Sequence, residues 1–209
     1  MLGCTKSKEL ITTQECNVAI FTNSLNSPNY TWENDTISIS SGAKSDFFNS
    51  PDGTEQKSNA PLLLKTIDNT KPFTFIAKVQ PEFAKTYDAG AIYLFYNTDL
   101  WQKFAFEMDE RGLTRLVTVR TIGTSDDNNH DAITPKEVYM KISSDTKTIG
   151  FYYSLDGQQW QLAKLYRNEY PQNIYLALSS QSPLGDGIKT HFTEINLTDK
   201  SIENFRLGE

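Results

Sequence analysis

Three side chains suited to binding a polar ligand occur in the segment WQKFAFE, residues 101–107. Successive residues of a β-strand point to opposite faces, so an extended conformation places Trp101, Lys103 and Glu107 on the same face. An aromatic ring can pack on the C–H surface of a sugar, and charged groups can bind its hydroxyls. Ala105 leaves room between Lys103 and Glu107. This face is therefore a candidate carbohydrate or small-ligand site, and the alternative is a cross-strand ion pair on a solvated face.

Three further residues are candidates for the same site. Asp46 precedes two aromatic residues and either faces the groove or ends a strand by accepting backbone N–H bonds. Tyr93 and Arg120 lie on predicted neighbouring strands. Whether their side chains join the site depends on a strand register that the sequence does not fix.

The sequence predicts no metal site and no cofactor. The segment Ser125–Asp131 is rich in oxygen donors, but its spacing matches no EF-hand loop and favours a solvated hairpin loop over a calcium site. His130 and His191 have no partner at the spacing of zinc ligands. Phosphate-binding and dinucleotide-binding motifs do not occur.

Composition excludes several classes of protein. The chain has 209 residues and a net charge of −6, and its Lys and Arg residues form no block, which argues against nucleic-acid binding. No apolar run approaches the ~18 residues that a membrane-spanning helix needs. Three Trp, ten Tyr and twelve Phe favour strands around one substantial core. These totals indicate a soluble, mildly acidic globular protein.

The N-terminus leaves the cellular location open. Cys4 and Cys16 suit neither a zinc site nor a disulfide framework. The chain carries no apolar signal region, which predicts a cytoplasmic protein. Alternatively, MLGC is the end of a bacterial lipoprotein signal whose apolar part is missing, and the protein is anchored to the cell envelope at Cys4.

Short apolar segments separated by Gly, Pro, Asn and Asp predict an all-β fold. The predicted strands are 36–40, 62–66, 73–79, 89–96, 101–108, 115–121, 138–143, 148–154, 161–165, 174–180 and 191–197. Asp156-Gly157 predicts a hairpin turn. This number of strands at hairpin spacing predicts an antiparallel two-sheet sandwich of the jelly-roll type over residues 21–209, preceded by an arm at 1–20.

Several motifs follow one another in a recognisable order. They are Trp32 with TISIS, Asp46-Phe47-Phe48, Ala89-Gly90, W-x-K-x-A-x-E at 101–107, F-x-Y-S-x-D-G-x-x-W at 151–160, LALSS at 176–180 with Ser182-Pro183, and Phe192. Together they resemble the "regulation of enolase protein 1-like" family of the concanavalin A-like lectin/glucanase superfamily. The resemblance covers residues 20–200 and departs from the family at Phe48, where Trp is usual, and at Ala105, where Gly is usual.

The resemblance implies a jelly-roll sandwich and a carbohydrate context. Our first expectation is a non-catalytic module that binds a glycan or a small polar ligand on its concave face. The first alternative is a polysaccharide hydrolase or lyase that uses Glu107. The glucanases of the superfamily often carry E-x-D-x-x-E, but Gly112 occupies the last acidic position here, and 109–112 is predicted to form a turn. The second alternative is a protein-interaction or regulatory module.

Overall fold

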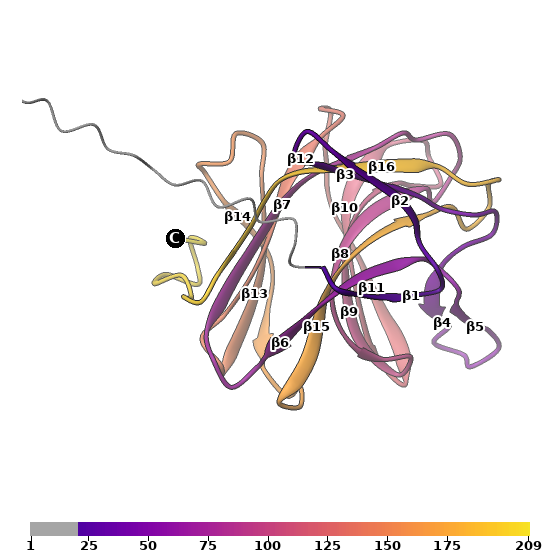
Figure 1. The fold of residues 1–209 in the computed structure, drawn as a ribbon. Helices are drawn as coiled ribbons and strands as arrows, with labels where there is room; N and C mark the ends of the chain where they lie inside the picture. Colours follow the sequence, from indigo (N-terminus) through magenta and orange to yellow (C-terminus); the bar gives the residue numbers. More distant parts are fainter. Residues whose placement is uncertain (1–20) are drawn as a thin grey trace, which may run out of the picture.

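The computed structural model describes residues 21–209, which form a β-sandwich of sixteen strands (Figure 1). The predictions made for the arm at 1–20, Cys4 and Cys16 lie outside the described residues. Within residues 21–209 the structure contains no helix long and apolar enough to cross a membrane.

Two antiparallel sheets of seven strands form the sandwich. The front sheet has the strand order β1 (Asn23–Leu25), β6 (Leu62–Asp68), β15 (Asn173–Gln181), β8 (Ala89–Asn97), β9 (Leu100–Met108), β10 (Thr114–Ile122) and β11 (Thr124–Ala132). The back sheet has the strand order β14 (Gln161–Arg167), β13 (Thr148–Ser154), β12 (Val138–Ser144), β7 (Phe73–Pro81), β16 (Lys189–Thr198), β3 (Thr36–Ser40) and β2 (Asn29–Glu33). The predicted all-β, two-sheet antiparallel sandwich is therefore confirmed.

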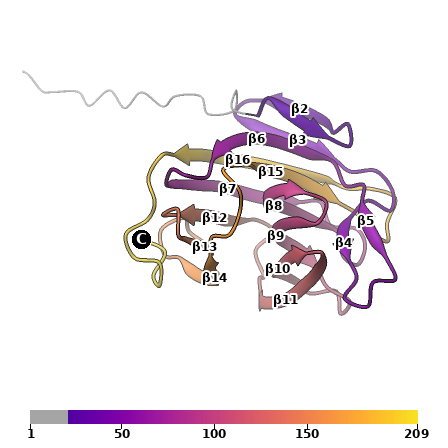
Figure 2. The same cartoon turned by 90° about the horizontal axis from the view of Figure 1, so that it is seen from below.

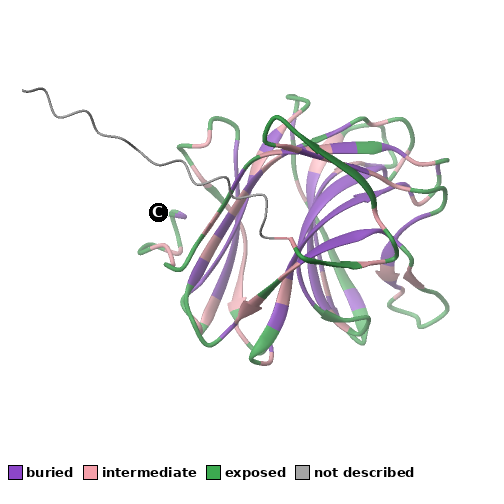
Figure 3. Cartoon of the chain, in the orientation of Figure 1, coloured by how far each residue is buried: buried purple, intermediate pink, exposed green. Residues whose placement is uncertain are grey.

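The main core lies between the inner faces of the two sheets. Phe104 and Phe106 of β9 are fully buried there, and the Phe104 ring meets Phe151 of β13 edge-to-face at 5.7 Å between centroids. Figure 3 shows the buried residues concentrated on the strands and the exposed residues on the loops. Alternation along β9 sends Trp101, Lys103, Ala105 and Glu107 to the opposite side, which is the outer face of the front sheet.

Every strand predicted from the sequence is present, with ends shifted by two residues at most. The hairpin predicted at Asp156-Gly157 joins β13 to β14, and Gly157 has the positive φ of 73° that favours glycine. The segment Ser125–Asp131 is not a loop, because it lies within β11 and pairs with β10. Its polar side chains suit an exposed strand at the edge of a sheet. A strand of this kind has no periodic pattern of apolar residues from which it could be predicted.

A small hairpin covers part of the outer face of the front sheet. It consists of β4 (Phe47–Asn49) and β5 (Gln56–Ser58), and β4 contacts β10 and β11 (Figure 2). The connection between its strands is held by its own hydrogen bonds. The Asp52 carboxylate accepts from the Ser50 hydroxyl at 2.8 Å and from the Thr54 amide at 3.0 Å, and Gly53 has a φ of 74°.

The C-terminal segment packs on the outer face of the back sheet. The Lys141 ammonium donates to the Gly208 carbonyl at 2.8 Å and lies 3.5 Å from the centre of the Trp160 ring. The Tyr152 hydroxyl donates to the Phe205 carbonyl at 2.8 Å. Each sheet therefore has part of its outer face covered. The β4–β5 hairpin covers part of the front sheet, and the C-terminal segment covers part of the back sheet.

Candidate functional site

The outer face of β9 brings together the side chains predicted to share it. In the register of the front sheet, Lys103 lies between Tyr93 of β8 and Val119 of β10, and Glu107 lies between Ala89 and Arg115. The predicted alternation is confirmed. The two ends of this row, however, have different environments.

Trp101 lies under the β4–β5 hairpin and is fully buried. Phe47 of β4 packs edge-to-face on its ring at 5.9 Å between centroids, and the indole N–H donates to the Thr98 carbonyl at 3.1 Å. Phe47 also packs edge-to-face against Tyr93 and Phe95. Because no ring face of Trp101 is exposed, the expectation that it stacks on a sugar has to be corrected. Its indole is part of a second apolar core.

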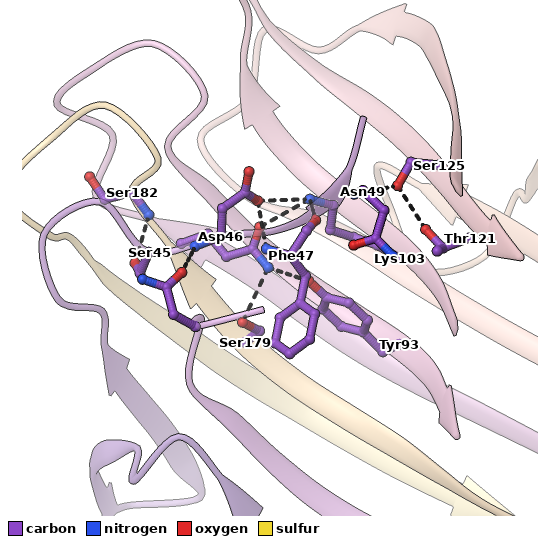
Figure 4. Close-up of polar contacts among 12 residues, drawn as sticks. Ser45, Asp46, Phe47, Asn49, Tyr93, Lys103, Thr121, Ser125, Ser179 and Ser182 are labelled. Atoms are coloured by element: carbon purple, nitrogen blue, oxygen red, sulfur yellow. Dashed lines mark hydrogen bonds and ion pairs between the residues drawn. The ribbon is translucent and has the colours of Figure 1, made fainter. Parts of the chain in front are cut away.

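Lys103 holds the β4 strand on the sheet. Its buried ammonium lies 3.3 Å from the Asp46 carboxylate and donates to the Phe47 carbonyl at 3.0 Å and to the Gln181 side-chain oxygen at 3.1 Å (Figure 4). Burial alone lowers the pKa of this ammonium, but the Asp46 carboxylate raises it, and the net pKa lies above the usual value for lysine. With three acceptors, Lys103 is a charged structural anchor.

Asp46 and Tyr93 belong to the same network. Asp46 also accepts a hydrogen bond from the Phe47 backbone amide at 2.8 Å, which agrees with the alternative that it accepts a backbone N–H at a strand end. The Tyr93 hydroxyl contacts the Gln181 amide, and burial raises its pKa above the usual value for tyrosine. In Figure 4 these side chains converge beneath β4.

Glu107 is the accessible member of the row. Its side chain is partly exposed, and its carboxyl makes no hydrogen bond within residues 21–209. Burial raises the pKa of this carboxyl to about 8, and the partial relief from Lys103 is countered by Asp127 and Asp46. At neutral pH the Glu107 carboxyl is therefore mostly protonated, and it can both donate and accept hydrogen bonds.

Two residues that sequence reasoning missed share the surroundings of Glu107. Asp127 of β11 lies level with Lys103 across β10, and burial together with the charge of Asp46 raises its pKa. The pKa of Tyr87 is raised, first by the partial burial of its hydroxyl and then by the Glu110 and Glu107 carboxylates. Much of the Tyr87 side chain is nevertheless exposed. In the sequence, only the adjacent acids of SDDNNHD drew attention to Asp127. The face of the sheet on which its side chain lies could be determined only from the register of β11.

Arg120 does not join this site. It pairs with Gln102, and it therefore points to the inner face, where its guanidinium lies 4.6 Å from the centre of the Tyr166 ring on β14. The candidate role for Arg120 on the outer face is corrected for this reason.

Asp109, which occupies the middle position of the partial E-x-D-x-x-E motif that begins at Glu107, stabilises a turn. The Asp109 carboxylate accepts from the amides of Arg111 and Leu113 at 2.9 and 2.8 Å, and it forms an ion pair with Arg115 at 2.6 Å. The predicted turn at 109–112 is confirmed, and Asp109 stabilises it. Glu107 and Asp109 are thus not a catalytic pair on one strand.

A Ser–His–Glu chain lies on the outer face of the back sheet. Ser38 contacts His191 Nδ1 at 2.8 Å, and His191 Nε2 contacts Glu82 at 2.8 Å. Ser38 lies inside β3, whose backbone pairs with both β2 and β16, so its amides are not available to stabilise an oxyanion. This chain is a surface hydrogen-bond network. No group of three or more His, Cys, Asp or Glu side chains among residues 21–209 is arranged to hold a metal.

Solved structures share this fold at low sequence identity. A functionally unknown protein from Saccharomyces cerevisiae has a TM-score of 0.78 and 21% identity, with 85% of this chain and 95% of that chain covered. A GH43 glycoside hydrolase engineered to display endo-xylanase and exo-arabinofuranosidase activity has a TM-score of 0.62 and 13% identity over 82% of this chain and 36% of that chain. The exoplasmic/lumenal domain of VIP36 in its Ca²⁺/Man3GlcNAc-bound form has a TM-score of 0.54 and 8% identity, with 87% and 85% covered.

These similarities concern the fold alone, because one fold carries many functions. The curated proteins include no significant match to this chain. The profile of the family described as "Protein of unknown function (DUF1349)" matches residues 25–200, which is most of the chain, and the protein therefore belongs to this family.

Proposed function

We propose that this protein binds a glycan or another small polar ligand on the outer face of the front sheet, at the end marked by Glu107. The observation that carries the proposal is the Glu107 carboxyl, which is partly exposed, has a pKa raised to about 8 and makes no hydrogen bond within residues 21–209. A protonated carboxyl presents one donor and one acceptor, a pair that matches a sugar hydroxyl. Strongly perturbed carboxyls are common at binding and catalytic sites.

The neighbours of Glu107 suit the same role. Asp127 adds an exposed acceptor, and Tyr87 adds an exposed ring. Lys103 and Asp46 lie beneath β4 and act as positioning residues, because their ion pair fixes the covered end of the face. Similarity to the folds of a glycan-bound protein and of glycoside hydrolases is consistent with a carbohydrate ligand and does not identify it.

The test is binding to a glycan array, followed by calorimetry with any glycan that binds. Glu107→Ala removes both hydrogen-bonding groups, and we expect it to raise the dissociation constant by about tenfold. Glu107→Gln keeps a neutral donor and acceptor and should retain most of the affinity. Glu33→Ala, at an exposed acid of β2 in the back sheet, is the matched control. Unchanged affinity in Glu107→Ala would refute the site.

A second candidate is a polysaccharide hydrolase or lyase in which Glu107 is the general acid. It is favoured by the raised pKa values of Glu107 and Asp127, since an acid must hold its proton near the working pH. Release of products from a polysaccharide panel would show it, and Glu107→Gln should abolish that release. The same variant thus separates catalysis from binding. A stoichiometric protein partner in a pull-down, without sugar binding, would instead favour a regulatory module.

A further inference from the structure

A second polar cluster lies between the two sheets at the open edge of the sandwich. Arg120 of β10 and Lys164 and Tyr166 of β14 point into this edge, and Tyr170 follows β14. The Arg120 guanidinium lies 4.6 Å from the centre of the Tyr166 ring. The Tyr166 and Tyr170 hydroxyls lie close enough for each to shift the pKa of the other. The cluster is on the opposite side of the front sheet from Glu107.

Hydrogen-bonding groups without partners are concentrated in this cluster. Among residues 21–209, six buried side-chain polar atoms lack a hydrogen-bond partner, and four of them are Nε of Arg120, Nζ of Lys164 and the hydroxyl oxygens of Tyr166 and Tyr170. The Tyr170 side chain is more than nine-tenths buried. Arginine and lysine nitrogens only donate, and tyrosine hydroxyls can donate. Gln102 Oε1, opposite Arg120 in the register of the front sheet, is also unpaired and is an acceptor, but one amide oxygen does not match all of these donors. The group that would complete this cluster is therefore a further acceptor.

The two cations of the cluster are weakly compensated, because the carboxylates that face them are mostly exposed. The Arg120 guanidinium lies 3.4 Å from Glu169 and the Lys164 ammonium 3.9 Å from Asp126, and the side chains of these two acids are 63% and 72% exposed. Such solvated contacts are weak and are screened by salt. Burial lowers the pKa of Lys164, and the nearby Arg120 lowers it further, although Asp126 partly offsets both. A buried anion would relieve this imbalance.

We propose that Arg120, Lys164, Tyr166 and Tyr170 form a binding site for a small oxyanion, such as a carboxylate, sulfate or phosphate group. The anion accepts hydrogen bonds from the two cations and the two phenols. It lies on the inner side of Arg120 and Lys164, and the exposed Glu169 and Asp126 lie on their solvent side. Buried polar groups in folded proteins are almost always paired, which makes a concentration of incompletely paired donors at one place a signature of a missing partner.

The anion can be free or part of a larger molecule. Tyr170 also lines a surface pocket of about 340 Å³, together with Asn69, Thr70, Thr146, Asn168 and Gln172. Amide and hydroxyl side chains suit the hydroxyls of a sugar, so a sugar acid is one source of the carboxylate. Free sulfate, phosphate and acetate are the other source.

The experiment is a thermal-shift and calorimetric titration of the whole chain with sulfate, phosphate, acetate and glucuronate. Sodium chloride at matched ionic strength controls for screening, and glucose controls for a neutral sugar. We expect saturable binding of at least one oxyanion. Tyr170→Phe, which removes only the hydroxyl, and Lys164→Met should each raise its dissociation constant by about tenfold or more. Glucuronate binding more tightly than acetate would identify the acidic-sugar source.

Lys57→Met, at an exposed lysine of the β4–β5 hairpin on the other side of the front sheet, is the matched control and should bind as the natural protein does. Sulfate also stabilises proteins non-specifically, and such an effect would be non-saturable and equal in all the variants. That result would overturn the proposal. A crystal structure with selenate provides an independent readout, because density for water alone beside Arg120 and Lys164 would also overturn it. Glu107→Ala should leave anion binding unchanged, so the two proposed sites can fail separately.

Discussion

The buried ammonium of Lys103 has three oxygen acceptors, of which only Asp46 carries a full charge. Removing one member of a buried ion pair leaves the other charge without compensation, and this loss costs more than the pair contributes when intact. At the scale of residues, Lys103 and Asp46 therefore determine whether β4 stays on the front sheet.

We expect Lys103→Met to lower the free energy of unfolding by about 3–5 kcal/mol. Lys57→Met is the control, because the Lys57–Glu55 pair is exposed and such pairs contribute only about 0–1 kcal/mol. Urea denaturation followed by circular dichroism measures both. A loss below about 1 kcal/mol in Lys103→Met would show that the pair does not anchor β4.

Glu107 makes stability depend on pH. Its pKa is about 8 in the folded protein against 4.5 in the reference state, so between these values the folded protein holds a proton that the unfolded chain releases. Stability should therefore fall as the pH rises from about 4.5 to 8, by at most about 1.4 kcal/mol per pH unit from this group. In Glu107→Gln, stability should fall less steeply with rising pH. Part of the fall should remain, because the pKa of Asp127 is also raised.

Denaturation curves of the two proteins across this pH range measure the difference. Glu33→Gln, at an exposed acid of β2 in the back sheet, should follow the natural protein. If the natural protein and Glu107→Gln show the same pH dependence, the Glu107 carboxyl is ionised at neutral pH, and the proposed hydrogen-bond donor is lost.

At the scale of elements, the β4–β5 hairpin decides which part of the outer face a ligand can reach. Phe47 is fully buried and contacts three aromatic rings. Hydrogen bonds add to this packing, because the Asn49 amide donates to the Ser125 hydroxyl at 2.9 Å (Figure 4). The covered end is consequently a second core, and the Glu107 end stays accessible.

Phe47→Ala should destabilise the protein by about 3–5 kcal/mol, the usual cost of emptying a buried phenylalanine site. It should also expose Trp101 and shift the tryptophan fluorescence to longer wavelength. Leu113→Ala, at a side chain that is 49% exposed, should change neither quantity appreciably. A stable Phe47→Ala protein with unshifted fluorescence would mean that β4 does not depend on this contact.

The strands and the alternation along β9 could be predicted because both depend on local patterns of apolar residues. β2 and β11 were missed because their residues are exposed and mostly polar, and β1, β4 and β5 because three residues each carry too little periodicity. The burial of Trp101 depends on Phe47, which is 54 positions away in the sequence. The facing of Arg120 depends on its pairing with Gln102. These are properties of register and long-range packing, and a single sequence does not determine them.

At the scale of the whole molecule, the C-terminal segment completes the outer face of the back sheet. Gly208 has a φ of 78°, and a Cβ added there would lie 2.8 Å from the Trp160 and Tyr152 side chains. We expect Gly208→Ala to destabilise the protein by about 1 kcal/mol or more, because alanine suits neither this conformation nor this space. A Cβ at Gly42 would meet nothing within 4 Å, so Gly42→Ala is the control in thermal denaturation. Equal midpoints would show that the segment is not docked.

The turn between β4 and β5 holds its own shape through Asp52 and Gly53, and it projects away from the contacts that Phe47 makes with the sheet. Exposed turns of this kind accept inserted sequence readily. Residues 51–54 are thus a natural place to graft a longer loop or a reporter peptide, with the anchored strand beneath acting as a fixed base. A graft at that point would change the surface beside the front sheet without rebuilding either core.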